Sequence, residues 1–221
     1  MIMVERKPNI IVLGARRDGH AGVVLDLVTQ YSLGSIIGFV DDDPTIQNTT
    51  IQGIPVLGPI NDFISKISPE TEGFFIASGD NAFRERCFKL VKQQGFSLVN
   101  IIHPSAVISR NAKIGEGVFI GPQVVINNNV VIGDGVLINT AATIDHDNTI
   151  EDFVNVSPGC HTSGRVRVKR GAFLGTGVST VPDITIGECA TVGAGAVVIR
   201  NVPAQTTVAG VPAVKLASSS S

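Results

Sequence analysis

An unbroken six-residue repeat runs from Ile108 to Val198 and restricts the second half of this chain to very few folds. Of the sixteen residues found at every sixth position, fourteen are aliphatic and two are threonine. The repeated residues are Ile108, Ile114, Ile120, Ile126, Ile132, Ile138, Ile144, Ile150, Val156, Thr162, Val168, Leu174, Thr180, Ile186, Val192 and Val198. Such repeats predict a solenoid, because one short repeat cannot bury its apolar side chains unless it stacks on its neighbours.

A second position of each hexad is also apolar. The residue two places before each repeated aliphatic is Ala, Val, Cys or Ile, with Asn148 as the one exception. Gly, Asn or Asp often follows the aliphatic, and these residues best tolerate the positive φ of a tight corner. We therefore expect a parallel β-helix rather than a β-sandwich with accidental periodicity. Three hexads would close a triangular coil, and residues about eighteen apart would stack at roughly 4.8 Å.

The repeat occupies only the second half of 221 residues, so a separate domain must precede it. Apolar patterns there alternate between strand and helix, which predicts a small Rossmann-like α/β lobe with a parallel sheet. We expect domains at 1–102 and 103–215 and a disordered tail at 216–221. Strands are expected at 10–13, 36–40, 74–77 and 98–101, and helices at 20–31 and 81–94.

Glycine-rich or acidic turns follow three of these strands, at the edge where parallel sheets bind ligands. The turn from Gly14 to Gly19 opens a helix, whose free N–H groups can hold a phosphate. It lacks the G-x-G-x-x-G spacing and the lobe is small, so a nucleotide diphosphate is favoured over NAD. Two alternatives stay open: the turn only reverses the chain, and the acidic run 41–43 is a solvated loop.

Composition narrows the partners. The net charge is −2 and no basic cluster accompanies the repeat, which argues against nucleic acid. The apolar run at 10–14 is too short for a signal peptide or a membrane span, so we expect a soluble, cytoplasmic protein that does not bind membranes. The three scattered cysteines fit reduced thiols. Cys160 and Cys189, in or near core positions, are expected to be buried.

His146 differs from the other three histidines because it lies at an expected coil corner between Asp145 and Asp147. Carboxylates beside an imidazole favour its protonated form, which suits general-base chemistry. The same coil carries Asn148 at a position that is apolar in every other hexad, and local rule-breaking in a regular repeat is typical of functional sites. His146 is therefore a candidate base, against the alternative of a solvated surface histidine.

Gly164 follows His146 by eighteen residues and is expected one coil above it. Its unobstructed backbone N–H could stabilise an oxyanion, and a base beside an oxyanion donor suits acyl transfer. A zinc site would need three imidazoles, but His146 and His161 are fifteen residues apart, so we expect no metal. We expect His103 to belong to a structural turn and His161 to serve structure or hydrogen bonding.

Six motifs occur in order along the chain: Gly-Ala with a later Gly-His-Ala at 14–21, Gly-Phe-Val-Asp-Asp-Asp at 38–43, Gly-Asp-Asn with a later Arg at 79–84, Ile-His-Pro-Ser-Ala-Val at 102–107, Asp-His-Asp at 145–147, and Val-Ala-Gly-Val-Pro-Ala at 208–213. On these motifs the chain resembles the two-domain hexapeptide-repeat sugar acetyltransferases of bacteria. That family includes the bacillosamine and perosamine N-acetyltransferases and the sialic acid O-acetyltransferase-like proteins. The resemblance extends from about Asn9 to Lys215.

The resemblance implies a left-handed β-helix, a homotrimer, acetyl-CoA as donor and a nucleotide-linked amino sugar as acceptor. It makes His146 the base, Asp147 its acidic partner and the Gly164 N–H the donor to the thioester oxygen. The implied sugar-nucleotide residues are Gly14, Arg16, Arg17, Asp18, Gly19, His20, Asp41, Asp42, Gly79, Asp80 and Asn81. The implied acetyl-CoA residues, on later coils between subunits, are Gly175, Thr176, Ala194 and Arg200.

Two departures from the family pattern stand out. The usual compact Gly-Ala-Gly-Gly-His turn is lengthened here by Arg16, Arg17 and Asp18, which could add a cationic grip on a diphosphate. Some relatives carry a second histidine nine residues after the base, where this chain has Asn155. The lengthened turn affects the expected contacts to the nucleotide. The asparagine at position 155 affects the expected acceptor.

We therefore expect an acetyl-CoA-dependent N-acetyltransferase that acts on a nucleotide-linked 4-amino-4,6-dideoxy sugar, with UDP as the first guess and GDP or dTDP as alternatives. The amine would attack acetyl-CoA directly, because no activated Ser or Cys lies beside His146. One rival function is O-acetylation of a sialic-acid-like sugar. Another, of a different class, is a trimeric scaffold that binds sugar nucleotide without turnover.

Overall fold

The computed structural model describes residues 8–15, 19–67 and 73–216. Arg16, Arg17 and Asp18, expected in the nucleotide turn, lie outside these residues, as does the tail from 217. The chain divides into two compact units, residues 1–101 and 102–221. Among the described residues, no helix is long and apolar enough to cross a membrane.

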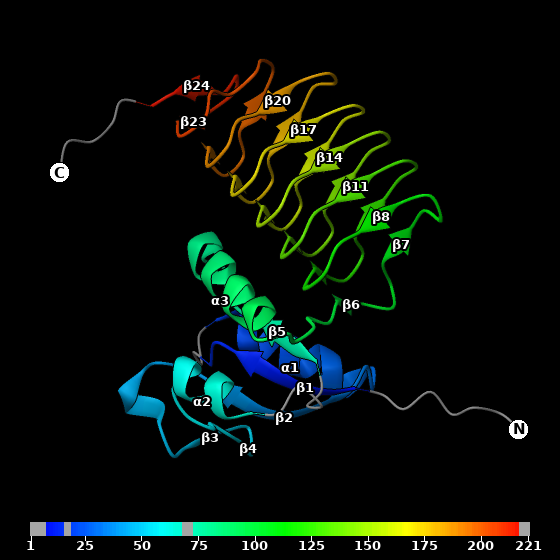
Figure 1. The fold of residues 1–221 in the computed structure, drawn as a ribbon. Helices are drawn as coiled ribbons and strands as arrows, with labels where there is room; N and C mark the ends of the chain where they lie inside the picture. The colour runs from blue at the N-terminus through cyan, green and yellow to red at the C-terminus, as the bar shows by residue number, and fades with distance from the viewer. Residues whose placement is uncertain (1–7, 16–18, 68–72, 217–221) are drawn as a thin grey trace, which may run out of the picture. The chain divides into compact units, whose positions relative to one another are not determined.

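The first unit is an α/β unit built on a three-stranded parallel sheet (Figure 1). The central strand β1 (Asn9–Leu13) pairs with β2 (Ser35–Val40) on one side and β5 (Phe74–Ile76) on the other. Helix α1 (His20–Gln30) connects β1 to β2, and α3 (Asn81–Gln93) follows β5. Nearly every residue of β1 is buried, as expected of a central parallel strand. The α/β alternation expected from the sequence is confirmed.

Several short elements of this unit were not expected. They are the 3₁₀ turn η1 (Pro44–Ile46), the hairpin of β3 (Thr50–Ile51) and β4 (Ile54–Pro55), and helix α2 (Ile60–Lys66). The prediction of a strand at 98–101 was wrong. Leu98 makes one isolated bridge to Phe74, and the following strand β6 (Ile101–Ile102) belongs to a sheet of the β-helix.

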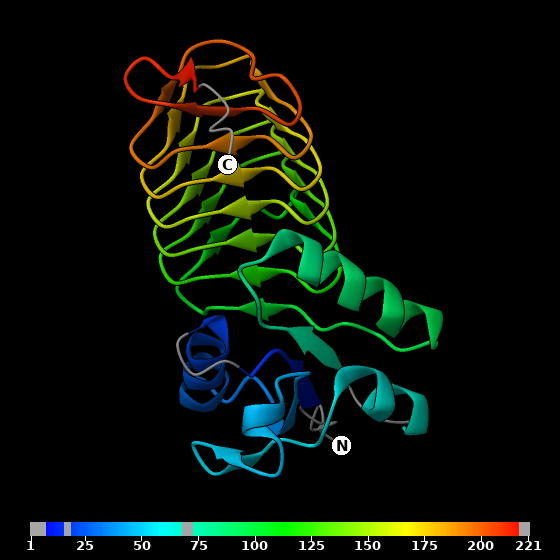
Figure 2. The same cartoon turned by 90° about the vertical axis from the view of Figure 1, so that its left-hand side faces the viewer.

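The second unit is a parallel β-helix whose strands stack in three ladders (Figure 2). From β6 to β22, partners in the ladders are eighteen residues apart, as in the pairs Val125–Thr143 and Thr143–His161, so the expected stacking is confirmed. In the last coil the spacing shortens to sixteen residues, as in the pair Thr191–Thr207, and β23 pairs with β24 in the antiparallel direction. One ladder consists of β7 (Val107–Ile108), β10 (Val125–Ile126), β13 (Thr143–Ile144), β16 (His161–Thr162), β19 (Ser179–Thr180) and β22 (Val197–Val198). A second consists of β8 (Lys113–Ile114), β11 (Val131–Ile132), β14 (Thr149–Ile150), β17 (Arg167–Val168) and β20 (Thr185–Ile186). The third runs from β6 through β9 (Phe119–Ile120), β12 (Leu137–Ile138), β15 (Asn155–Val156), β18 (Phe173–Leu174) and β21 (Thr191–Val192) to β23 (Thr207–Ala209) and β24 (Val214–Lys215).

Both apolar positions of the hexad point into one continuous core, which the aliphatic side chains fill from Val118 to Val208. Cys160 lies in this core as expected, fully buried. The expectation for Cys189 was wrong: its position is a corner with φ 52°, where the side chain faces outward and is exposed.

The corner glycines act differently from what the sequence suggested. Positive φ falls three residues after the repeated aliphatic, at Asp147 and Arg165 for example, and not at the glycine directly after it. At that earlier position a Cβ on Gly175 would lie 2.7 Å from the backbone nitrogen of Ala194 in the next coil. A Cβ on Gly187 would lie 2.4 Å from that of Ala204. These glycines therefore allow close stacking of neighbouring coils and are not needed for a left-handed backbone.

Candidate active site

The His146 ring lies at a corner that follows strand β13, with its side chain 46% exposed. Its Nδ1 is 2.7 Å from Oδ2 of Asp147. In the neutral imidazole a proton on Nδ1 is then donated to this carboxylate, which leaves the Nε2 lone pair to accept a proton. The geometry matches a base whose ring and tautomer are fixed by a neighbouring acid.

Two carboxylates hold this corner, and asparagines of the coil below hold the carboxylates. Asp145 accepts the His146 backbone N–H at 2.8 Å and the Asn127 side chain at 2.8 Å. Oδ1 of Asp147 accepts the Asn129 side chain at 3.1 Å. The hydrogen bond with the His146 ring, followed by that from Asn129, lowers the pKa of Asp147. Asp147 is therefore ionised at neutral pH and available to orient the ring.

Gly164 lies against the His146 ring in the neighbouring coil. A Cβ at Gly164 would be 2.6 Å from both Cε1 and Nε2 of His146, so any side chain here would displace the imidazole. The Gly164 carbonyl accepts from Asp183, whereas its N–H has no acceptor among the described residues. The structure thus places a bare backbone donor beside the Nε2 edge of the candidate base.

The other two histidines of the β-helix do not join this corner. The His103 ring Nδ1 accepts the Ser105 backbone N–H at 3.0 Å, as in the expected turn. The His161 Nδ1 lies 2.9 Å from the hydroxyl oxygen of Thr143 in the adjacent strand. Within the described residues, no group of three or more His, Cys, Asp or Glu side chains could hold a metal ion.

The residues expected to bind acetyl-CoA lie on two different edges of the β-helix. Gly175, Thr176 and Ala194 share the edge that follows the third ladder, where the Gly195 N–H donates to Thr176 O at 2.8 Å. Arg200 is exposed on the edge that carries His146, three coils further along. Three stacking steps correspond to about 14 Å. One chain does not bring Arg200 together with the other three.

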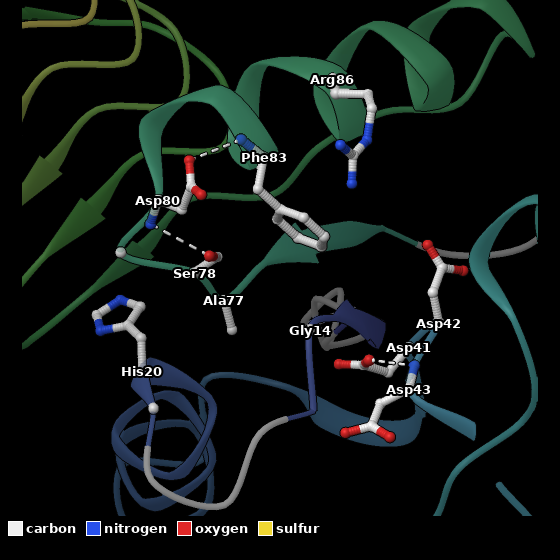
Figure 3. Close-up of a pocket in the computed structure, with 12 residues that line it drawn as sticks. Gly14, His20, Asp41, Asp42, Asp43, Ala77, Ser78, Asp80, Phe83 and Arg86 are labelled. Carbon is white, nitrogen blue, oxygen red and sulfur yellow. Dashed lines mark hydrogen bonds between the residues drawn. The ribbon is translucent and has the colours of Figure 1, made fainter. Parts of the chain in front are cut away.

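A cavity of about 640 Å³ opens at the carboxyl ends of β1, β2 and β5 in the α/β unit (Figure 3). Gly14 forms part of its floor, and a Cβ at this position would be 2.9 Å from the Ala77 carbonyl oxygen. Of the described residues expected to bind the nucleotide, all but one line this cavity. They are Gly14, Gly19, His20, Asp41, Asp42, Gly79 and Asp80.

The exception is Asn81, whose Oδ1 accepts from the buried Arg84 at 2.8 Å. Arg84 also donates to the Ser78 carbonyl at 3.0 Å, and thus ties the loop after β5 to α3. Burial of the guanidinium lowers the pKa of Arg84 to about 10, against the opposing effect of Asp80. Burial, helped by the Arg84 charge, lowers the pKa of His20 to about 4, so this ring is neutral at pH 7.

The acidic residues of the cavity mainly hold backbone turns. Asp41 accepts the Ala15 N–H at 2.7 Å and the Asp43 N–H at 2.9 Å. Asp42 accepts the Ile60 N–H at 2.9 Å, and Asp80 caps α3 through the Phe83 N–H at 3.0 Å. The acidic run 41–43 is therefore an ordered part of the cavity wall, and the alternative of a solvated loop does not hold.

Five residues that line the cavity were not among the expected binding residues: Asp43, Ala77, Ser78, Phe83 and Arg86. The first three lie in or beside the turns that the sequence placed at this edge, whereas Phe83 and Arg86 were missed altogether. Figure 3 shows Phe83 and Arg86 reaching toward the cavity from α3, across from Asp41 and Asp43, whereas Asp80 lies on the α3 side. The Arg86 guanidinium lies 5.1 Å from the centre of the Phe83 ring, within the range of a cation–π contact. Among the described lining residues, Arg86 is the one with a permanent positive charge.

Two family models match this chain. Residues 9–91 match the PglD N-terminal domain, and residues 99–192 match the GMPPB C-terminal domain.

Solved structures of several relatives are similar over almost the whole chain. A histidine-to-alanine variant of GDP-perosamine N-acetyltransferase from Caulobacter crescentus, in complex with CoA and GDP-perosamine, is 36% identical, with a TM-score of 0.88 and coverage of 95% of this chain and 97% of its own. The acetyltransferase domain of PglB from Neisseria gonorrhoeae FA1090, in complex with acetyl coenzyme A, is 36% identical, with a TM-score of 0.86 and coverage of 96% and 100%. WeeI from Acinetobacter baumannii AYE is 32% identical, with a TM-score of 0.84 and coverage of 94% and 99%.

Among curated proteins, the serine acetyltransferase of Escherichia coli strain K12 is 43% identical over 47 residues. This match spans 21% of this chain and 17% of that protein. The match to the PglD N-terminal domain and the similarity to the solved structures confirm the expected fold, an α/β lobe followed by a left-handed β-helix of hexapeptide repeats.

Proposed function

Because this chain belongs to the hexapeptide-repeat sugar acetyltransferase family, we propose that it transfers the acetyl group of acetyl-CoA to the amine of a nucleotide-linked 4-amino-4,6-dideoxy sugar. The α/β unit would bind the nucleotide and the β-helix would catalyse the transfer. One feature supports this assignment most: the His146 ring is hydrogen-bonded to Asp147 through Nδ1 and faces the bare Gly164 backbone with its Nε2 edge.

In this reaction, His146 Nε2 accepts the proton that the sugar amine loses as its nitrogen bonds to the thioester carbonyl carbon. Asp147 stays ionised and stabilises the imidazolium that forms. The Gly164 N–H donates to the oxygen that becomes negative in the tetrahedral intermediate. When the carbon–sulfur bond breaks, His146 returns the proton to the CoA thiolate, so the products are an amide, free CoA and the starting enzyme.

The cavity of the α/β unit has the chemistry for a nucleoside diphosphate. Helix α1 begins at His20, and its N-cap residue Gly19 also lines the cavity, so an anion bound there would lie near the positive end of the helix dipole. Arg86 adds a positive charge at the opposite wall. His20, neutral and partly buried, offers a hydrogen-bonding group without a charge.

The chain is also expected to act as a homotrimer, with acetyl-CoA held between subunits. The separation of Arg200 from Gly175, Thr176 and Ala194 on one chain supports this arrangement, because a neighbouring subunit could bring the two edges to one donor molecule. Sedimentation at micromolar concentration tests it. A trimer is expected, and a monomer would contradict a shared acetyl-CoA site.

The proposed reaction is tested by thiol release from acetyl-CoA with a panel of UDP-, GDP- and dTDP-linked 4-amino sugars, together with CMP-sialic acid and free sialic acid. We expect turnover with one amino-sugar nucleotide. Release with sialic acids alone would replace N-acetylation with O-acetylation. Tight nucleotide binding without any release would instead indicate a non-catalytic scaffold.

A further inference from the structure

Asn148 is the one polar residue at its position in the hexad, and it is fully buried in a core that is otherwise almost entirely apolar. At the same position, the neighbouring coils carry Val130 and Val166. Its Oδ1 has no hydrogen-bond partner among the described residues. Burying an unpaired carbonyl costs free energy, so packing alone does not explain why an asparagine occupies this position.

The side-chain nitrogen of Asn148 joins the two corners that form the candidate active site. Nδ2 lies 2.8 Å from the Asp145 carbonyl oxygen and 3.3 Å from that of His146. It also lies 2.8 Å from the Ser163 carbonyl oxygen in the next coil. One buried amide therefore contacts the backbone at the base and the peptide that leads into Gly164.

The contact with Ser163 determines the direction of the Gly164 N–H. In a trans peptide the carbonyl and the N–H of the next residue point in opposite directions. Because Asn148 holds the Ser163 carbonyl toward the core, the Gly164 N–H is turned away from the core. At another corner the equivalent carbonyl, Asn139 O, accepts from Ala142 N in its own turn at 3.1 Å.

We propose that Asn148 is a positioning residue, which orients the Ser163–Gly164 peptide so that its N–H donates to the oxyanion, and which keeps this donor in register with His146. This inference rests on the proposed acetyl transfer. It gives a reason for the unpaired Oδ1: the fold keeps a costly amide in the core because its nitrogen sets the geometry of two corners.

The test is Asn148→Val, which restores the aliphatic rule of the repeat. We expect kcat to fall about 10- to 100-fold, because a misdirected oxyanion donor loses part of the roughly 10²- to 10³-fold that such a donor contributes. The KM for both substrates should stay within about twofold and the thermal midpoint should not fall, since valine fits the core. The crystal structure of the variant should show the Ser163–Gly164 peptide rotated.

Two further variants separate positioning from folding. Val130→Ala, in the coil below, leaves a cavity but removes no hydrogen bond, so it should lower the thermal midpoint and keep kcat. Asn148→Cys should recover part of the rate, because Cys160, at the same hexad position, donates from Sγ to the Gly175 carbonyl at 3.1 Å. A kcat for Asn148→Val within about threefold of wild type would overturn the proposal.

The crystal structures keep this test separate from the test of the reaction. If the wild-type protein acetylates no acceptor, the proposed function fails, and the orientation of the peptide alone decides the role of Asn148. A rotated Ser163–Gly164 peptide in Asn148→Val would support positioning, and an unchanged peptide would contradict it.

Discussion

The two units of this protein build their sites in different ways. In the β-helix, the residues of the His146 corner stack on residues eighteen positions away in the neighbouring coils. Asn129, Asp147 and Arg165 therefore occupy the same position in successive coils. In the α/β unit, the cavity forms where loops from three strands converge. A repeat thus fixes a site through its register, whereas the α/β unit depends on long-range contacts such as Asp41 with Ala15.

The largest expected effect is on the β-helix site. His146→Ala should lower kcat about 10²- to 10⁴-fold, because the general base is lost, with the KM for the acceptor nearly unchanged. His161→Ala is the matched control, since its imidazole contacts Thr143 and not the corner. Steady-state kinetics measure both. Equal rates for His146→Ala and wild type would remove this corner from the mechanism.

The stability of the α/β unit should depend on pH because of His20, a residue that is not part of the β-helix site. Between pH 6.5 and about 4, the unfolded chain binds a proton at His20 that the folded protein excludes. Stability should therefore be complete above pH 6.5 and fall as the pH falls, by roughly 3 kcal/mol in total. Urea unfolding, followed by the helical circular dichroism signal, measures this, because the described α-helices lie in the α/β unit. An equally steep pH dependence in His20→Asn would contradict the assignment.

The stacking of Gly164 on the His146 ring can be tested by adding one methyl group at Gly164. Gly164→Ala places a Cβ 2.6 Å from His146 Nε2, so the ring must move and kcat should fall about 10- to 100-fold. Gly159→Ala is the control, because its Cβ meets open space and its φ of 64° costs only stability. Both variants need kcat and a thermal midpoint. Normal catalysis by Gly164→Ala would show that contact with the ring is unimportant.

The smallest expected effect lies at the α/β cavity. Arg86→Ala should raise the KM for the sugar nucleotide about tenfold and leave kcat unchanged, because a charge-assisted contact to a phosphate contributes to binding alone. Lys92→Ala, exposed on the same helix, should change neither constant. If Arg86→Ala lowers kcat and leaves KM unchanged, the nucleotide does not bind beside this side chain.

The sequence predicted the β-helix more fully than the α/β unit, and the reason is physical. Inward residues, ladder register and the proximity of Gly164 to His146 follow from a single period. The position of the positive φ could not be predicted from the period. Glycine is also favoured where neighbouring coils stack closely, as at Gly175, so a glycine in the repeat does not by itself mark a positive φ. In the α/β unit, the glycine-rich and acidic turns were enough to predict where the cavity lies. Phe83 and Arg86 were missed because their direction depends on how α3 packs, which local sequence does not encode.

The most direct test of the central claim is product analysis with an isotope-labelled acetyl group on CoA and the amino-sugar nucleotide that gives turnover. We expect the label to enter the nucleotide sugar as an amide that is stable to hydroxylamine, and we expect His146→Ala to form almost none of this product. Label recovered as a hydroxylamine-sensitive ester, or amide formed at the full rate by His146→Ala, would contradict the central claim.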